Sequence, residues 1–387
     1  MKLLRRPEWL ILGIVCIAAN LRAPITSLPT VVDLIQIDTG LSSAALGLLT
    51  SLPLFVFALV SLCSASVAQR FGLERSLYYA IWFMLIGVGL RSLPHLAALY
   101  MGNNIIAVGI ALGNVLLPGL IKRDFPQRIA LITSLYALSM GIIAALVSAV
   151  TVPIAHVWGW RIALLAMSLM ILITLVVWWP QRHKGRPQAE QRRRSASISL
   201  WRHPLAWQVS LFLGLNSLMY YIVVSWLPAM LQASGFSADE AASMQGVLQL
   251  ATAIPGLVIV PLIARFKDQR IVVVLMMLPV FVGLLGLWLY PDAAWWWSVI
   301  LGFGSGAVFV LALSFVGMRV ATAPLAAALS GMAQFIGYLL AAGGPALTGK
   351  MHDISQSWAS TLIFCLVIAV MMLISGLYAG RDQQIQA

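Results

Sequence analysis

The chain has 387 residues, of which 61% are hydrophobic and only 9% charged, and its formal net charge is +12. This composition excludes an ordinary soluble domain, because apolar stretches of about 20 residues, long enough to cross a bilayer as helices, recur along the chain. It also excludes a β-barrel, whose alternating segments of about 10 residues are absent. The sequence therefore predicts an all-α, polytopic membrane protein.

Twelve transmembrane helices are expected. In chain order they cover residues 9–32, 41–68, 76–94, 97–121, 130–153, 160–180, 205–231, 240–264, 271–290, 294–318, 326–350 and 358–379. Cys16, Cys63 and Cys365 all fall inside these spans and form neither a disulfide framework nor a metal-binding pattern. We therefore expect no metal and no cofactor. The first apolar run is long enough to span and lacks a cleavage motif, so it should act as its own insertion signal.

The first span carries an arginine near the middle of the membrane. Arg22 lies about 20 Å from Trp9 at ~1.5 Å per residue, in a hydrocarbon layer ~30 Å thick. A guanidinium at that depth costs at least a few kcal/mol unless it faces a cavity or a partner. Pro24 lacks an N–H and leaves the Asn20 carbonyl unpaired one turn earlier. A bent helix with a fixed cation predicts a binding site for a small polar or anionic solute, with Asn20 and Arg22 in it.

The two halves of the sequence repeat. Thr39-Gly40-Leu41-Ser42 precedes the second span, and Ser234-Gly235-Phe236-Ser237 precedes the eighth, 195 residues later. The windows 70–75 and 265–270, each with Arg-Phe and a later Arg, follow the same spans at the same offset. Two six-helix halves in parallel orientation are therefore expected. The predicted units are an N-terminal half over 1–180, a basic linker over 181–203 and a C-terminal half over 204–387.

Basic residues are distributed unevenly between the two faces. With a cytoplasmic N-terminus, most of the 24 Lys and Arg residues fall on the cytoplasmic side, and Arg91, Arg161 and Lys350 fall near the other. The positive-inside rule then places both termini in the cytoplasm. The charge therefore reports topology and contact with anionic membrane lipids, and no nucleic-acid partner is expected.

Further polar side chains lie inside the predicted spans. Asn216 and Tyr220 share one face of the seventh span, since residues four apart are neighbours on a helix. Asn114 in the fourth span, Gln249 in the eighth and the pair Gln334 and Tyr338 in the eleventh complete the set. Each of these alone is more often a helix–helix hydrogen bond than a ligand contact. Together with Arg22 they form the candidate substrate-binding set, centred between helices 1, 4, 7 and 10.

Acidic groups are expected outside the membrane centre. All 12 Asp and Glu and all 5 His fall in loops or at span ends. Arg22 is therefore expected to lack a negative partner in the protein and to be available to a substrate. Proton coupling would have to use an edge residue such as Asp33 or the substrate itself.

Enzymatic functions are disfavoured. The sequence has no Gly-x-x-x-x-Gly-Lys phosphate loop, and the spans hold no paired aspartates, no Ser/His pair and no His-Glu-x-x-His metal site for an intramembrane protease. We expect no catalytic residues and no enzyme activity.

The twelve spans, the repeat, the basic central loop and one turn resemble the major facilitator superfamily. The turn is Ala-Gln-Arg-Phe-Gly-Leu-Glu-Arg over 68–75. It is similar to the superfamily signature Gly-x-x-x-Asp-Arg-x-Gly-Arg between helices two and three, with Gln69 in place of the usual aspartate. The resemblance implies that loops near this turn and its repeat gate the cytoplasmic side. The candidate gating residues are Arg70, Arg75, Arg265 and Arg270.

Within the superfamily, the chain resembles, over its full length, the family of cyanate permeases and 2-nitroimidazole transporters. The resemblance rests on Asn20-Leu21-Arg22, on Ala-Leu-Gly-Asn-Val-Leu-Leu-Pro-Gly-Leu-Ile-Lys-Arg over 111–123 and on Ala-Leu-Ser-Gly-Met-Ala-Gln over 328–334. Segments 205–209 and 302–307 are closer to the 2-nitroimidazole branch. It implies a monomeric secondary transporter of the bacterial inner membrane that exports 2-nitroimidazole by alternating access.

Several alternatives stay open at this point. A permease for cyanate or another small anion would use the same arginine. Proton-coupled drug efflux fits less well, because a buried cation without a buried carboxylate repels cationic cargo. A channel or a non-transporting sensor is the alternative from a different class.

Overall fold

The protein is described by a computed structural model over residues 7–41, 43–182 and 200–386. Most of the expected linker, 181–203, therefore lies outside the described residues. Among the described residues the regular structure is helical, with one isolated bridge between Val320 and Ile385. This confirms the predicted all-α class.

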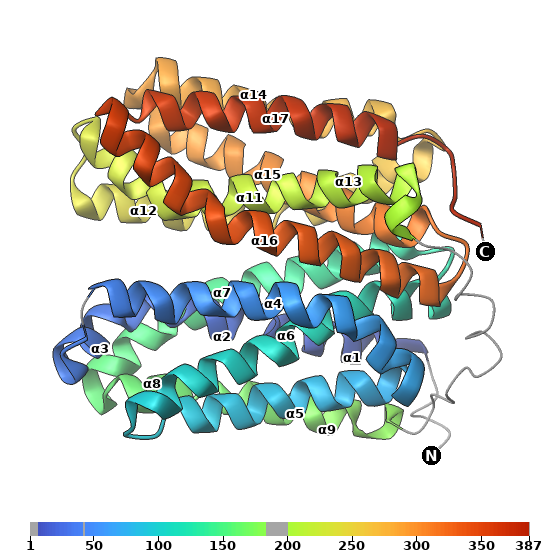
Figure 1. Ribbon diagram of the computed structural model, residues 1–387, viewed down its shortest axis with the longest axis horizontal. Coiled ribbons are helices and arrows are strands. Elements are labelled where there is room, and N and C mark those ends of the chain that lie inside the picture. Colours follow the sequence, from blue (N-terminus) through green and yellow to red (C-terminus); the bar gives the residue numbers. More distant parts are fainter. Residues whose placement is uncertain (1–6, 42, 183–199, 387) are drawn as a thin grey trace.

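The helices form two groups that lie one above the other in Figure 1. The first group runs α1 (Pro7–Asn20), α2 (Ala23–Thr26), α3 (Val32–Thr39), α4 (Ser43–Phe71), α5 (Leu73–Arg91), α6 (Leu96–Asp124), α7 (Ile129–Trp158), α8 (Trp160–Leu165) and α9 (Ser168–Trp178). The second runs α11 (Pro204–Ala233), α12 (Ala238–Ala251), α13 (Pro255–Arg265), α14 (Arg270–Leu289), α15 (Ala294–Met318), α16 (Ala323–Ser355) and α17 (Ala359–Ala379). We refer to the two groups as the N-half and the C-half.

Eleven stretches of the described chain are long and apolar enough to cross a membrane. The expected eighth span, 240–264, is absent from these eleven because it is built as two helices, α12 with 14 residues and α13 with 11. A turn over 252–254 separates them, and Pro255 begins α13. Proline suits the first turn of a helix, where its missing N–H has no role, but it interrupts the hydrogen-bond ladder of a continuing one. Hydropathy alone does not reveal such a break.

The sequence repeat is visible in the backbone. Gly40 and Gly235, at equivalent positions, both take a left-handed conformation, with φ of +66° and +98°. Each lies just before the second long helix of its half, where the chain reverses direction. Glycine adopts this conformation without the steric cost of a Cβ atom, which explains glycine at both turns.

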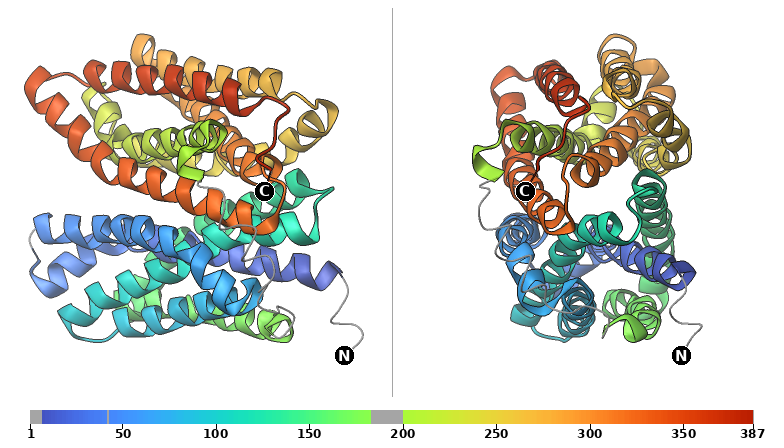
Figure 2. Two further views of the ribbon diagram at one scale, coloured as in Figure 1. Left: turned by 45° about the vertical axis from the view of Figure 1, so that its right-hand side comes forward. Right: turned by 90° about the vertical axis from the view of Figure 1, so that its right-hand side faces the viewer.

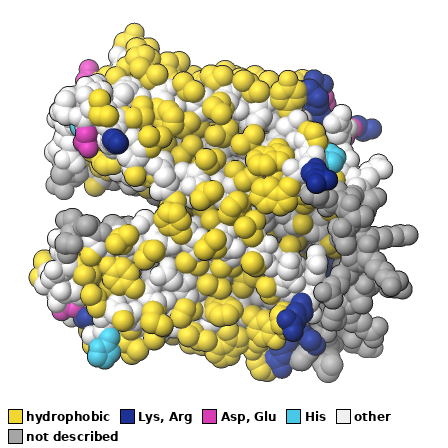
Figure 3. All heavy atoms as spheres, in the orientation of Figure 1, with side chains coloured by type: hydrophobic (Ala, Val, Ile, Leu, Met, Phe, Trp, Pro, Cys, Tyr) yellow, Lys and Arg dark blue, Asp and Glu magenta, His cyan; other side chains and the backbone are white. Residues whose placement is uncertain are grey.

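The two halves meet along a closely packed seam. A Cβ atom added to Gly331 of α16 would lie 2.6 Å from the Ser61 carbonyl oxygen of α4, and one added to Gly119 of α6 would lie 3.1 Å from the Ala327 Cβ of α16. Small residues of this kind let helix backbones approach closely in membranes. Figure 3 shows a notch between the halves at the end of the molecule away from both termini, whereas the halves meet toward the other end.

The outer surface is apolar between two polar ends. Hydrophobic side chains cover most of the face in Figure 3, and the Lys and Arg side chains of that face lie mainly at the end near the termini. Residues such as Leu169 and Val176 are 66% and 74% exposed. Such apolar exposure is typical of a surface in contact with lipid tails.

The C-terminal segment is attached to the loop that precedes α16. Ile385 donates its backbone N–H to the Arg319 carbonyl (2.8 Å) and accepts from the Ala321 N–H (3.1 Å). The Arg319 guanidinium in turn donates to the carbonyls of Ala379 and Gly380 at 2.8 and 2.9 Å. The end of the chain is therefore part of the C-half, as both views of Figure 2 show.

Candidate functional site

The first helix is interrupted where the sequence predicts its bend. α1 ends at Asn20, and α2 starts at Ala23 with Pro24 in its first turn. Arg22 lies between them as the N-cap of α2, with non-helical φ of −124°. The break therefore projects the Arg22 side chain from irregular backbone between two helix ends. Such breaks occur in membrane proteins where they are buried in protein or line a cavity.

The Arg22 side chain contacts two residues of the C-half. Its Nη2 donates to the Gln249 Oε1 at 3.0 Å, and its guanidinium carbon lies 4.8 Å from the centre of the Tyr220 ring. The Tyr220 hydroxyl donates to the same Gln249 oxygen at 2.6 Å. Arg22, Tyr220 and Gln249 therefore form one cluster, which we call the central triad, and it joins the two halves.

The central triad refines the expectation of a guanidinium without any partner. No ion pair to Arg22 occurs among the described residues, so no described carboxylate neutralises its positive charge. It is, however, held by a neutral amide and an aromatic ring, and cation–π contacts contribute about 0.5–2 kcal/mol.

Gln249 is the last polar residue of α12 before the turn over 252–254, so the triad joins the broken first helix to the broken eighth span.

A second cluster links the halves beside the triad. Asn114 of α6 donates from Nδ2 to the Tyr338 hydroxyl of α16 at 3.1 Å and accepts from the Tyr136 hydroxyl of α7 at 2.7 Å. The Tyr338 ring packs on Phe57 of α4, with ring centres 4.8 Å apart. The Ser330 hydroxyl donates to the Asn114 backbone carbonyl at 3.3 Å. The structure therefore brings Asn114 and Tyr338 together, although the sequence did not pair them.

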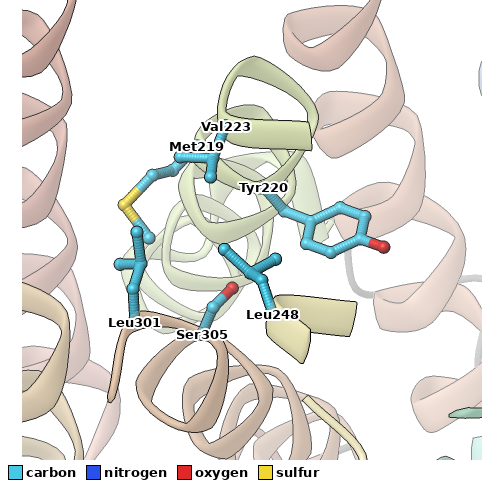
Figure 4. Close-up of a pocket in the computed structure, with 6 residues that line it drawn as sticks. All are labelled: Met219, Tyr220, Val223, Leu248, Leu301 and Ser305. Atoms are coloured by element: carbon cyan, nitrogen blue, oxygen red, sulfur yellow. The ribbon is translucent and has the colours of Figure 1, made fainter. Parts of the chain in front are cut away.

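Asn216 and Tyr220 lie beside a small pocket in the C-half. The pocket has an empty volume of about 200 Å³ and is lined by Met219, Tyr220, Val223, Leu248, Leu301 and Ser305. In Figure 4 the Tyr220 ring lies on the opposite side of the pocket from Met219 and Leu301, and its hydroxyl points away from them. Ser305 donates to the Asn216 Oδ1 at 3.5 Å. The Tyr220 side of the central triad therefore borders a mainly apolar pocket.

Two predicted site residues lie apart from the triad's contacts. Asn20 is fully buried and donates to the Cys16 carbonyl at 2.9 Å and to the Thr174 hydroxyl at 2.8 Å, both within the N-half. Gln334 is 5% exposed, and its side chain forms no hydrogen bond with another described residue. In the structure, the Asn20 side chain therefore links α1 to α9. The side chain of Asp33 lies outside the described part of the structure.

The four candidate gating arginines are exposed at the end of the molecule near the termini. Arg270 pairs with Asp268 at 2.6 Å inside its own loop, and its hydrogen bonds lower the pKa of that carboxyl group. Arg70 lies over Phe71. Within the described ranges, no ion pair joins the two halves. A partly buried ion pair at this end instead joins Glu74 to Arg123 at 2.6 Å within the N-half.

A second membrane arginine was not anticipated. Arg91, expected as a charge near the far face, is fully buried at the end of α5. Its Nη1 donates to the Pro24 carbonyl at 2.7 Å, its Nη2 contacts the Met167 sulfur at 3.3 Å, and its Nε has no partner among the described residues. No sequence pattern pointed to this burial; in the structure, a Cβ added to Gly102 of α6 would lie 2.3 Å from the Arg91 backbone nitrogen. Close packing of α5 on α6 encloses the arginine.

Comparison with known proteins agrees with this architecture. The Major Facilitator Superfamily model matches residues 10–345. The chain is 48% identical over 379 residues to the 2-nitroimidazole transporter of Escherichia coli (strain K12), covering 97% of this chain and 96% of that protein. It is 26% identical over 369 residues to the cyanate transport protein CynX of the same organism, covering 94% and 95%.

Solved structures support the fold. The proton:xylose symporter XylE superimposes with a TM-score of 0.78 at 14% identity, over 96% of this chain and 94% of that one. A likeness at this identity speaks for the fold and not for the substrate. The paired helical halves and the match over most of the chain lead to one assignment, which the resemblance in the sequence had predicted. The chain belongs to the major facilitator superfamily, and within it to the family of 2-nitroimidazole and cyanate transporters.

Proposed function

We propose that this transporter carries small, planar, polar or anionic solutes across the bacterial inner membrane by alternating access, and that its main activity is export of 2-nitroimidazole. The observation that carries the proposal is the central triad, in which Arg22 and Tyr220 both donate toward one oxygen atom. A relative of this chain at 48% identity is a 2-nitroimidazole transporter, which supports the choice of solute.

The chemistry of a nitro group suits this arrangement. It presents two coplanar, partly negative oxygens, as a carboxylate does, and a guanidinium fork can donate to both. In the proposed complex the nitro group meets Arg22 and the Tyr220 hydroxyl. The heterocycle packs against the ring of Tyr220 or Tyr338, and Asn216 takes its N–H. Asn114, Gln249 and Gln334 complete the wall.

Alternating access is supported by the shape of the molecule. The halves pack closely toward the end with the termini and leave a notch at the other end (Figure 3). If both termini are cytoplasmic, as the positive-inside rule predicts, this conformation opens to the periplasm. We propose that the halves rock about the triad, and that the loops with Arg70, Arg75, Arg265 and Arg270 separate when the cytoplasmic side opens. The proposed transporter acts as a monomer, with membrane lipids around it.

Growth and transport together test this proposal. Cells that lack the gene should become more sensitive to 2-nitroimidazole, and cells that overexpress it should become more resistant. Purified protein in liposomes should show saturable flux and counterflow of labelled 2-nitroimidazole, and excess unlabelled cyanate or benzoate reports whether small anions share the site. Unitary ionic currents without saturation would indicate a channel. Preference for cationic over anionic competitors would indicate drug efflux and contradict the proposal.

A further inference from the structure

Gln249 is the shared hydrogen-bond acceptor of the central triad. Its Oε1 atom accepts hydrogen bonds from the Arg22 Nη2 at 3.0 Å and from the Tyr220 hydroxyl at 2.6 Å. One amide oxygen therefore satisfies a charged donor from the N-half and a neutral donor from the C-half. Gln245, one turn earlier on α12, has a different role, because it donates to the Val224 carbonyl at 2.9 Å within the C-half.

The point where two donors converge is also the most favourable position for an anion's oxygen. Hydrogen bonds from a charged donor contribute more than neutral ones, about 1.5–3 kcal/mol net. Arg22 has no described carboxylate partner, so the Gln249 oxygen is its hydrogen-bond acceptor among the described side chains. An oxyanion or nitro oxygen placed there would gain both donors, but two oxygens cannot occupy one position.

We infer that Gln249 is an internal competitor of the substrate: its amide oxygen holds the position that a substrate oxygen takes, and binding requires the Gln249 side chain to withdraw. This inference rests on the proposed site at Arg22 and adds a role for Gln249 that differs from that of a simple ligand. The exchange replaces a hydrogen bond between the halves by one to the substrate. Gln249 thereby sets affinity and links binding to the contact between the halves.

Two substitutions at this one position should have opposite effects. Gln249→Leu removes the competing oxygen while keeping an apolar side chain of similar length, and should lower the dissociation constant about tenfold, the equivalent of ~1.4 kcal/mol. Gln249→Glu places a carboxylate beside Arg22, where a charged acceptor competes more strongly, and should raise the dissociation constant at least tenfold. Gln249→Ala provides a second removal of the oxygen, should the leucine disturb packing.

The measurement is binding of labelled 2-nitroimidazole to the purified full-length protein in detergent, with benzoate as a second probe that carries a full negative charge. Gln245→Leu is the matched control, because it removes an amide from the same helix without touching Arg22, and it should leave the dissociation constant unchanged. Size-exclusion profiles verify that each variant is folded.

The outcomes separate this inference from the proposed function. Tighter binding by Gln249→Leu or Gln249→Ala, with weaker binding by Gln249→Glu, supports the competitor role. Weaker binding by all three would make Gln249 an ordinary ligand, and unchanged binding would make it a structural link between helices; either result overturns the inference while leaving the proposed function in place. If the unaltered protein binds neither probe, the proposed function itself fails.

Discussion

Arg22 and Arg91 are two arginines inside predicted membrane spans, and neither pairs with a carboxylate among the described residues. Their surroundings differ. Arg22 is half-buried and reaches side chains of the opposite half, whereas Arg91 is fully buried and contacts its own half. In the proposed alternating-access cycle, the contacts of Arg22 between the halves would change, whereas those of Arg91 within the N-half would persist.

The two arginines are connected through the break in the first helix. Arg22 is the N-cap of α2, and Arg91 donates to the carbonyl of Pro24, the second residue of this four-residue helix. A carbonyl without a partner in a membrane interior costs several kcal/mol, so a broken helix needs such a donor. The comparison teaches that one guanidinium stabilises the irregular backbone that presents the other. Residue type and depth alone do not distinguish the two roles.

Arg22→Ala should have the largest effect on transport. Removal of a charged hydrogen-bonding partner typically costs 2–5 kcal/mol, so we expect transport of 2-nitroimidazole in liposomes to fall roughly 100-fold or more. Thermal stability should change less than transport, because the Arg22 side chain is only partly buried. Arg22→Lys keeps the charge but loses the planar fork and should recover only part of the activity. Normal transport by Arg22→Ala would show that Arg22 does not bind the substrate, and would contradict the distinction drawn between Arg22 and Arg91.

Arg91→Leu should have the opposite profile. The substitution removes the charged donor of the Pro24 carbonyl, which keeps only the longer hydrogen bond from the Ser27 hydroxyl at 3.2 Å. A hydrogen bond from a charged group contributes about 1.5–3 kcal/mol. We expect a lower melting temperature, measured by fluorescence-detected size exclusion, with a half-saturation concentration close to normal in the protein that remains folded. Loss of substrate binding at unchanged stability would place Arg91 in the site after all.

Tyr338→Phe and Tyr136→Phe compare a contact between the halves with a contact inside one half, here for neutral side chains. Both hydroxyls bond to Asn114, but Tyr338 does so from the C-half and Tyr136 from the N-half. A neutral hydrogen bond contributes about 0.5–1.5 kcal/mol, so Tyr338→Phe should change the half-saturation concentration for transport roughly 2- to 10-fold. Tyr136→Phe should change it less and lower thermal stability more. Equal effects in transport would show that the boundary between halves has no special role here.

Asp38→Asn should have the smallest effect. Asp38 accepts from Arg161 at 2.5 Å at an exposed position, and the hydrogen bonds from Arg161 and Trp160 lower the pKa of its carboxyl group. A lowered pKa stabilises the fold above the ordinary value near 4 and loses this contribution as the pH falls through the folded value. The variant should therefore melt slightly earlier than the parent at pH 7, and the difference should shrink as the pH falls below about 4. A difference that grows on acidification would contradict this assignment.

Much of the architecture could be predicted from the sequence. The apolar runs, the 195-residue repeat with Gly40 and Gly235, and the polar break at Arg22 and Pro24 are local features, and local features can be recognised in a single chain. The candidate list also contained all three members of the central triad. The division of the eighth span at Pro255 was missed, because residues on both sides of that proline are apolar.

The partners of these residues could not be predicted in the same way. Gln249 meets Arg22, and Tyr338 meets Asn114, only because the halves dock in one particular register, and 227 and 224 residues separate the members of these pairs. The burial of Arg91 likewise depends on the approach of α5 to α6 at Gly102. Such contacts are set by packing between distant segments, which hydropathy and periodicity do not encode.

The attachment of the C-terminal segment has a practical consequence. Ile385 is fully buried and bonded to the loop that leads into α16, the helix that carries Gly331 and Tyr338 to the N-half. An affinity tag or fluorescent protein placed close behind Ile385 would disturb these hydrogen bonds and, through them, the position of α16, which contacts helices of both halves. Fusions at the carboxyl end therefore need a spacer long enough to leave the bridge between Val320 and Ile385 undisturbed.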